Sequence, residues 1–135
     1  MRSSGSSFLL LLAPALALGA CSASGPGASH LADSTWQFVA IDETAPVGKM
    51  AMLSFEGDRI GANVGCNGMG GPWRVEDGRL IAGPLVQTEM YCEGKVWTQE
   101  KAVGALLAGA PTLEVTKDTL VLKSSGHSAR LERTR

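Results

Sequence analysis

From residue 33 to the end of the chain, short segments alternate apolar and polar residues, and turn-forming residues separate one segment from the next. Successive side chains of a β-strand point to opposite faces, so each segment can bury one face and expose the other. The apolar members of the segments are Trp36, Phe38 and Ala40; Ala51 to Phe55; Ile60, Ala62 and Val64; Trp73 and Val75; Leu80 and Ala82; Leu113 and Val115; Leu120 and Leu122; and Ala129 and Leu131. Asp77-Gly78, Lys117-Asp118 and Ser125-Gly126 indicate tight turns. The pattern predicts about eight short antiparallel strands.

One stretch departs from this two-residue period. Its apolar residues recur at the spacing of a single helical face, and they are Val96, Val103, Leu106, Leu107 and Ala110. Gly109 and Pro111 supply a stop signal, so we expect a helix over about 95–109, with Trp97 at its edge or at the seam between helix and sheet. The chain is therefore predicted to be α+β, with a mainly antiparallel curled sheet or partly open β-barrel of about eight short strands and one helix packed on it.

The first twenty residues have the features of an export signal. Arg2 precedes an apolar run from Phe8 to Leu18. A helix of this length spans about 16 Å, roughly half of the ~30 Å hydrocarbon core, which is typical of a signal peptide and too short for a membrane span. Leu18-Gly19-Ala20-Cys21 resembles the lipobox of bacterial lipoproteins, and a plain secretory signal cut near Ala20 is the alternative. Residues 1–20 are therefore predicted to be a lipoprotein signal peptide.

The lipobox implies a lipid-modified Cys21 at the start of the mature chain. Each buried CH₂ of an acyl chain contributes roughly 0.8 kcal/mol, and two or more chains hold a protein stably at a bilayer. Residues 21–32 are then the lipidated cysteine and a flexible Gly/Ser-rich linker, in which His30 has no special role, and the domain covers 33–135. Ser22, in place of an aspartate, indicates sorting to the outer membrane, where the domain would face the periplasm.

The remaining cysteines, Cys66 and Cys92, have several candidate states. Neither belongs to a CxxC pair, so a zinc site would need ligands that this chain lacks, and no metal or other cofactor is expected. An oxidising compartment favours a disulfide between them, which would close a loop of about 25 residues and stabilise the domain by roughly 3–3.5 kcal/mol. Free thiols and a catalytic pair of a cysteine with His127 are the alternatives.

Other patterns argue against a nucleic-acid binder and against an enzyme. A formal charge of −1, from 12 Lys+Arg and 13 Asp+Glu, excludes a strongly basic nucleic-acid protein. The Gly-rich stretch 61–73 lacks the Gly-Lys-Ser/Thr and the following helix of a phosphate-binding loop, so turns and bulges are its expected role. Glu89, Glu93 and Glu100 are interpreted as surface charges. The sequence contains no GxSxG or HExxH motif, and no catalytic residue is assigned.

Two short motifs resemble those of the META/HslJ-like domain family. They are Gly65-Cys66-Asn67, with Gly71 shortly after, and Thr88-Glu89-Met90-Tyr91-Cys92, and the resemblance covers nearly all of residues 31–132. It implies an antiparallel, partly open β-barrel with a helix against it, similar to the small barrel of secretion pilotin lipoproteins. It also implies an association with heat shock, novobiocin resistance and secretion or motility, without catalytic residues. The family motif positions expected to be structural are Gly65, Asn67, Gly71, Thr88 and Met90.

These observations predict a non-enzymatic envelope lipoprotein with a binding or stress-maintenance role. The expected partners are the membrane, reached through the lipid on Cys21, and an unidentified envelope protein or hydrophobic ligand, with nucleic acid excluded. Two alternatives stay open: a carrier that holds a lipid or other hydrophobic ligand in the barrel, and a pilotin-like chaperone for an outer-membrane assembly.

Intact-mass analysis of the mature protein from its native membrane checks the export prediction. We expect a chain that begins at Cys21, carries acyl groups, and lacks two protons because Cys66 and Cys92 are paired. A polypeptide that begins at Met1, with three titratable thiols and no fatty acid, would contradict it.

Overall fold

The computed structural model describes residues 27–135. The predicted signal peptide, 1–20, and the predicted lipidation site, Cys21, lie outside the described residues. Within the described part of the chain, no helix has both the length and the apolar character needed to span a membrane.

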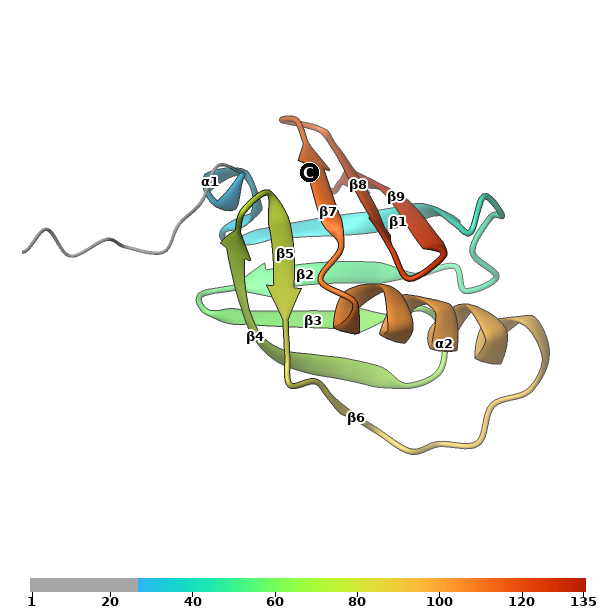
Figure 1. Cartoon of the computed structure of the whole chain (residues 1–135). Coiled ribbons are helices and arrows are strands. Elements are labelled where there is room, and N and C mark those ends of the chain that lie inside the picture. Colours follow the sequence, from blue (N-terminus) through green and yellow to red (C-terminus); the bar gives the residue numbers. More distant parts are fainter. Residues whose placement is uncertain (1–26) are drawn as a thin grey trace, which may run out of the picture.

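Nine antiparallel strands form the body of the protein (Figure 1). They are β1 Ser34–Ile41, β2 Met52–Glu56, β3 Arg59–Asn63, β4 Gly68–Glu76, β5 Arg79–Ala82, β6 Val86–Gln87, β7 Thr112–Val115, β8 Thr119–Ser124 and β9 His127–Arg133. Their order is β3-β2-β1-β9-β8-β7-β5-β4-β6, and a further pairing of β3 with β4 closes the ring. The α+β class is confirmed: eight strands form a closed barrel rather than a partly open one, and β6 is an additional strand beside β4.

The strand that closes the barrel, β4, pairs with different neighbours along its length. Gly68 to Pro72 pair with β3, and Trp73 to Glu76 pair with β5. Turns and bulges are the expected role of the Gly-rich stretch 61–73, which is wrong for Gly68, Gly70 and Gly71, because these glycines are already paired with β3. A Cβ added at Gly70 would come within 3.1 Å of the Ile60 carbonyl oxygen, so the missing side chain lets β3 and β4 lie close together.

Two of the predicted tight turns are confirmed by their backbone angles. Asp77 and Gly78, between β4 and β5, have φ values of 51° and 71°. Ser125 and Gly126, between β8 and β9, have φ values of 54° and 75°. Positive φ at both central residues is the signature of a type I′ hairpin turn, whose twist matches that of the strands it joins.

Large apolar side chains fill the interior of the barrel. The largest fully buried ones are Trp36, Phe38, Phe55, Leu31, Ile41, Leu53, Leu80, Leu106, Leu107, Leu120, Leu122 and Leu131. Most of them are at positions that the alternation assigns to the buried face. The pairing of β1 with β9 is irregular between Phe38 and Ala40, and beyond this point Ile41 takes the buried position predicted for Ala40.

The main helix, α2 (Gly94–Ala108), lies across one end of the barrel and packs against β5, β8 and β9 (Figure 1). Its bounds agree with the predicted helix to within one residue at each end. Val103, Leu106 and Leu107 are buried in the core. The Ser124 hydroxyl donates a hydrogen bond of 2.6 Å to the Leu106 carbonyl oxygen, which joins the helix to β8.

A short helix, α1 (Ala28–Leu31), corrects the expected boundary between linker and domain. Leu31 is 0 % exposed and belongs to the hydrophobic core, so the folded part begins before residue 33. Arg133 on β9 donates from its guanidinium to the carbonyl oxygen of His30 and lies over the Trp36 ring, 4.4 Å from its centroid. Ala28 is also buried against the core, and the Gly/Ser-rich composition of 21–32 concealed both residues.

Replacing Leu31 with alanine tests whether α1 is part of the core. We expect Leu31→Ala to lower the free energy of unfolding by about 2–4 kcal/mol, because it leaves a cavity among buried side chains. His30→Ala is the matched control: this side chain is exposed, and the change should stay within about 0.5 kcal/mol. Urea unfolding measures both. Equal stability of the two variants would mean that α1 only rests on the surface.

Candidate functional site

A disulfide between Cys66 and Cys92 lies at the end of the barrel where the first turn of α2 begins. Cys66 precedes β4 and Cys92 precedes α2, and their Cα atoms are 6.4 Å apart. The predicted disulfide is therefore confirmed, and it joins two loops that are distant in the sequence. Because both sulfurs are bonded to each other, neither is a thiol nucleophile in this state.

The carboxylate of Glu100 reaches from α2 into this corner. Its side chain is 1 % exposed and accepts hydrogen bonds from the Asn67 backbone N–H at 2.9 Å, from Asn67 Nδ2 at 2.8 Å and from Gln87 Nε2 at 2.5 Å. The interpretation of Glu100 as a surface charge is wrong. Its position between Val96 and Val103, at helical spacing, places it on the buried face, and that spacing is the signal that could have found it.

Asn67 is the centre of the hydrogen-bond network. Its side-chain carbonyl, Oδ1, accepts from Thr88 Oγ1 at 3.0 Å and from the Met90 N–H at 2.7 Å, while Nδ2 also donates to the Met90 carbonyl at 3.1 Å. The residue is 1 % exposed. The structure thus brings together three of the motif residues, Asn67, Thr88 and Met90, beside the disulfide. Their shared role is to hold the segment before α2 against the start of β4.

The two motif glycines are explained by close approach. Gly65 has a φ of 138°, and a Cβ there would come within 2.8 Å of the Val96 side chain on α2. Gly71 lies in β4, and a Cβ there would collide with the Pro84 carbonyl oxygen. Both positions exclude side chains because another segment occupies the space.

Gln99 is a further buried polar residue of α2 that the sequence pattern missed. Its Nε2 donates to the Ala45 carbonyl at 2.9 Å, and its Oε1 accepts from the Val47 N–H at 2.9 Å. These two bonds fix the loop between β1 and β2 to the same corner. Among the described residues, no buried side-chain nitrogen or oxygen lacks a hydrogen-bond partner.

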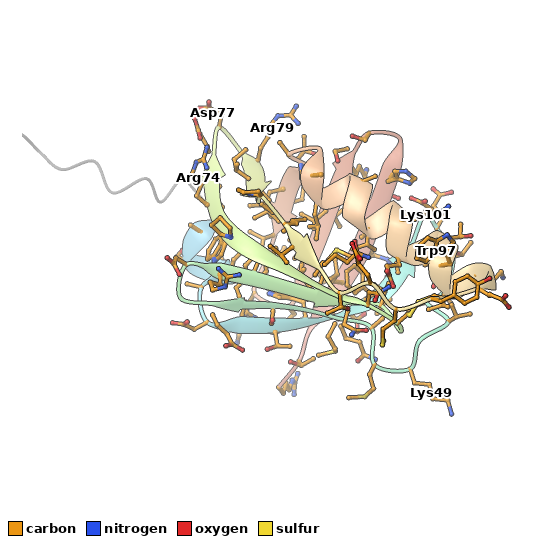
Figure 2. All side chains as sticks on the ribbon, turned by 90° about the horizontal axis from the view of Figure 1, so that it is seen from below. Lys49, Arg74, Asp77, Arg79, Trp97 and Lys101 are labelled. Atoms are coloured by element: carbon orange, nitrogen blue, oxygen red, sulfur yellow. A yellow bond between two sulfur atoms is a disulfide. The ribbon has the colours of Figure 1, made fainter. Side chains whose placement is uncertain are left out.

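An open hollow of about 580 Å³ lies outside this corner. It is lined by Asn67, Gln87, Thr88, Glu89, Met90, Tyr91 and Trp97. Tyr91 is 86 % exposed, Met90 57 % and Trp97 38 %. The Tyr91 hydroxyl donates to Glu93 at 2.7 Å, and this hydrogen bond to a carboxylate raises the pKa of the phenol above its ordinary value. Lys101 lies over Trp97 (Figure 2), with its Nζ 5.6 Å from the ring centroid.

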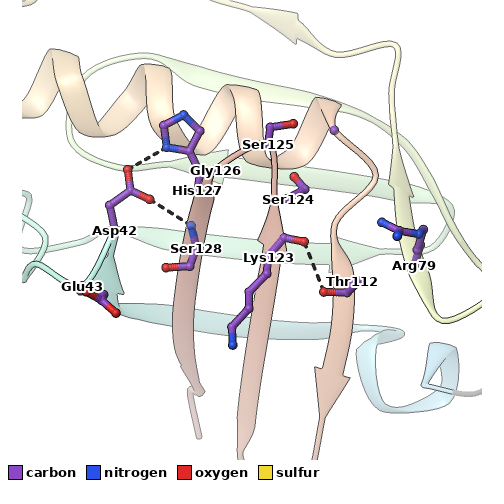
Figure 3. A pocket seen from close by; sticks show the side chains of 11 residues that line it. Asp42, Glu43, Arg79, Thr112, Lys123, Ser124, Ser125, Gly126, His127 and Ser128 are labelled. Atoms are coloured by element: carbon purple, nitrogen blue, oxygen red, sulfur yellow. Dashed lines mark hydrogen bonds and ion pairs between the residues drawn. The ribbon is translucent and has the colours of Figure 1, made fainter.

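A second open hollow, of about 780 Å³, contains His127 (Figure 3). His127 Nδ1 lies 2.7 Å from Asp42 Oδ2, and Asp42 Oδ1 accepts from the Ser128 N–H at 2.9 Å. Partial burial raises the pKa of Asp42. The hydrogen bonds from Ser128 and His127 and the charge of His127 lower this pKa, and together they outweigh the effect of burial, so the pKa of Asp42 lies below its ordinary value. His127 is therefore engaged with Asp42, and its pairing with a catalytic cysteine finds no support.

The protein is a small β-barrel domain with a single core. Its class is defined by a closed eight-stranded barrel, one helix across the barrel end, and a disulfide-linked corner around a buried asparagine. The META domain model matches residues 29–135, so the chain belongs to the META domain family. The resemblance drawn from the Gly-Cys-Asn and Thr-x-Met-x-Cys motifs is confirmed.

Solved structures share this fold. One NMR structure of a protein has a TM-score of 0.67 and 17 % identity, and the match covers 77 % of this chain and 92 % of that chain. An NMR structure of a protein from Burkholderia xenovorans has a TM-score of 0.64 and 20 % identity, with 99 % of each chain covered. At these identities the likeness establishes the fold alone. No curated protein matches the chain.

Truncating the central asparagine tests the network. We expect Asn67→Ala to lower the free energy of unfolding by about 2–4 kcal/mol, because it removes the Nδ2 donor to the buried Glu100 carboxylate and leaves the Met90 N–H without a partner. Asn63→Ala is the matched control, because Asn63 is exposed and its side chain makes one hydrogen bond, accepted from the Gly65 N–H. This substitution should lower the free energy of unfolding by at most about 1 kcal/mol. Equal losses in chemical unfolding would show that the network adds nothing to stability.

Proposed function

We propose that this META domain is a binding module of the cell envelope, held at a membrane by lipid on Cys21, and that its binding surface is the hollow lined by Met90, Tyr91 and Trp97. The META family is not a known enzyme family. The observation that carries the proposal is the exposure of these three large apolar side chains beside a cross-linked and fully hydrogen-bonded corner. Neighbouring exposed apolar groups on a rigid base are typical of interaction sites.

The rigidity of this base supports binding without rearrangement. The segment that carries Met90 and Tyr91 is held by the disulfide at Cys92 and by the hydrogen bonds of Asn67. A surface whose backbone is already fixed loses little conformational entropy when a partner binds. Tyr91 and Trp97 also have few rotatable bonds, and such side chains are enriched where binding energy concentrates.

The filled interior argues against the carrier alternative. The barrel core is occupied by large buried side chains, among them Trp36, Phe38 and Phe55. A hydrophobic ligand inside the barrel would have to displace this packed core, which is dense in the manner of other protein interiors. The surface hollow therefore suits a partner that binds from outside, and a pilotin-like chaperone would use it in this way.

The placement of the hollow fits a tethered protein. The first described element, α1, lies at the end of the molecule opposite the segment before α2 (Figure 1). If the chain before α1 runs to a lipid on Cys21, a partner in the periplasm can reach the hollow without the tether in its way. Such an arrangement favours a protein partner over the bilayer itself.

Site-specific photo-crosslinking in intact cells tests the proposal. A photoreactive amino acid at Tyr91 should give one dominant protein adduct, and Trp97→Ala in the same chain should reduce it at least tenfold, because aromatic anchors dominate interface energies. The same amino acid at Arg74 is the control, since Arg74 is exposed at the opposite end of the molecule (Figure 2).

The identity and pattern of the adducts decide the outcome. A subunit of an outer-membrane assembly as the dominant adduct would support the pilotin-like form of the proposal. Equal adducts from the Tyr91 and Arg74 positions, or a Tyr91 adduct that Trp97→Ala leaves unchanged, would overturn it. A stoichiometric lipid in the extracted protein would favour the carrier instead.

A further inference from the structure

Three groups that bind metals converge at the corner described above. One ligand atom from each of Cys66, Cys92 and Glu100 lies within 4.8 Å of the others. Two sulfurs and a carboxylate oxygen form a donor set that zinc accepts in proteins. The cysteines come from two loops and the glutamate from α2, so no short sequence spacing reveals the set.

The carboxylate in this cluster is buried without a cation. Glu100 is 1 % exposed, and the hydrogen bonds that it accepts come from neutral groups of Asn67 and Gln87. The ion pairs among the described residues, Arg74 with Glu76 and His127 with Asp42, lie elsewhere. Burial of an ionised carboxylate is costly, and a nearby positive charge offsets that cost.

We propose that reduction of the Cys66–Cys92 disulfide converts this corner into a site for a thiophilic divalent cation of the zinc class. A dithiol reductant supplies two electrons and two protons: the S–S bond breaks, both sulfurs become thiols, and the dithiol is oxidised to its own disulfide. With a phosphine, water supplies the two protons and its oxygen goes to phosphorus, which is oxidised to the phosphine oxide. The cation then displaces both thiol protons and binds the two sulfurs together with a carboxylate oxygen of Glu100. Water takes the fourth position, as in zinc sites with three protein ligands.

The surroundings of the sulfurs suit both steps. Cys66 is partly exposed and Cys92 is 8 % exposed, so an external thiolate reaches Cys66 Sγ first and Cys92 leaves as the thiolate. Asn67 Nδ2 lies 3.5 Å from Cys92 Sγ and can donate to that thiolate. A hydrogen bond donated to a ligating sulfur strengthens a metal site.

Metal titration of the full chain in both redox states tests this inference. The chain carries Cys21→Ser, so that only Cys66 and Cys92 supply thiols. A phosphine reduces the disulfide, and the phosphine is then removed under oxygen-free conditions. In a titration with Co²⁺, the reduced chain should bind one equivalent and show a thiolate-to-cobalt charge-transfer band. Zn²⁺, added next, should also bind as one equivalent. Metal binding should release two protons. The oxidised chain should bind at least a hundredfold more weakly.

Two variants separate the role of Glu100 from that of the sulfurs. Glu100→Gln should weaken zinc binding by the reduced chain at least tenfold, whereas Glu93→Gln, an exposed neighbour, should leave it unchanged. Binding that is equal in both redox states, or that Glu100→Gln does not weaken, would overturn the proposal.

A second measurement keeps the test decisive if Glu100→Gln does not fold. X-ray absorption of the zinc-loaded, reduced chain should show two sulfur ligands near 2.3 Å and oxygen ligands at about 2.0–2.2 Å. Zinc should also raise the thermal midpoint of the reduced chain and leave that of the oxidised chain unchanged. A reduced chain that binds no zinc at micromolar concentrations would refute the site.

Discussion

The buried contact between Glu100 and Asn67 is the interaction on which the rest of this end of the molecule depends. It joins α2, which covers the barrel, to the residue just before β4, the strand that closes the barrel. A buried carboxylate stays favourable only while its donors remain in place, because each donor that is lost removes part of the compensation for its burial. Helix position, strand start and motif segment are therefore coupled through one side-chain pair.

The disulfide and the polar network act on the same corner by different physical means. The Cys66–Cys92 bond lowers the entropy of the unfolded chain, whereas the hydrogen bonds of Asn67 select one arrangement of the folded one. With the backbone held in both ways, Tyr91 can remain exposed without the segment around it rearranging. The corner is thus held both by a covalent bond and by hydrogen bonds, and under the proposed function it is the base that carries the exposed binding side chains.

Local features of the sequence predicted most of the secondary structure. The strands that contain Trp36, Leu80 and Leu131, the turn at Asp77-Gly78 and the helix over about 95–109 all follow from periodicity and turn chemistry, which involve near neighbours only. Features that need contact between distant segments were missed. These were the pairing of the glycines before Pro72, the packing of Leu31, and the additional strand β6, whose two residues are too few to show a period.

By itself, the sequence determined the α+β class, the spacing of the elements and the motif residues, and it favoured a disulfide between Cys66 and Cys92. The tertiary structure alone decided that the barrel closes, that Glu100 is buried, and that Asn67, Thr88 and Met90 share one network. The reason is physical. A period shows which face of an element is apolar, but the environment of a polar side chain on that face depends on which distant segment packs against it.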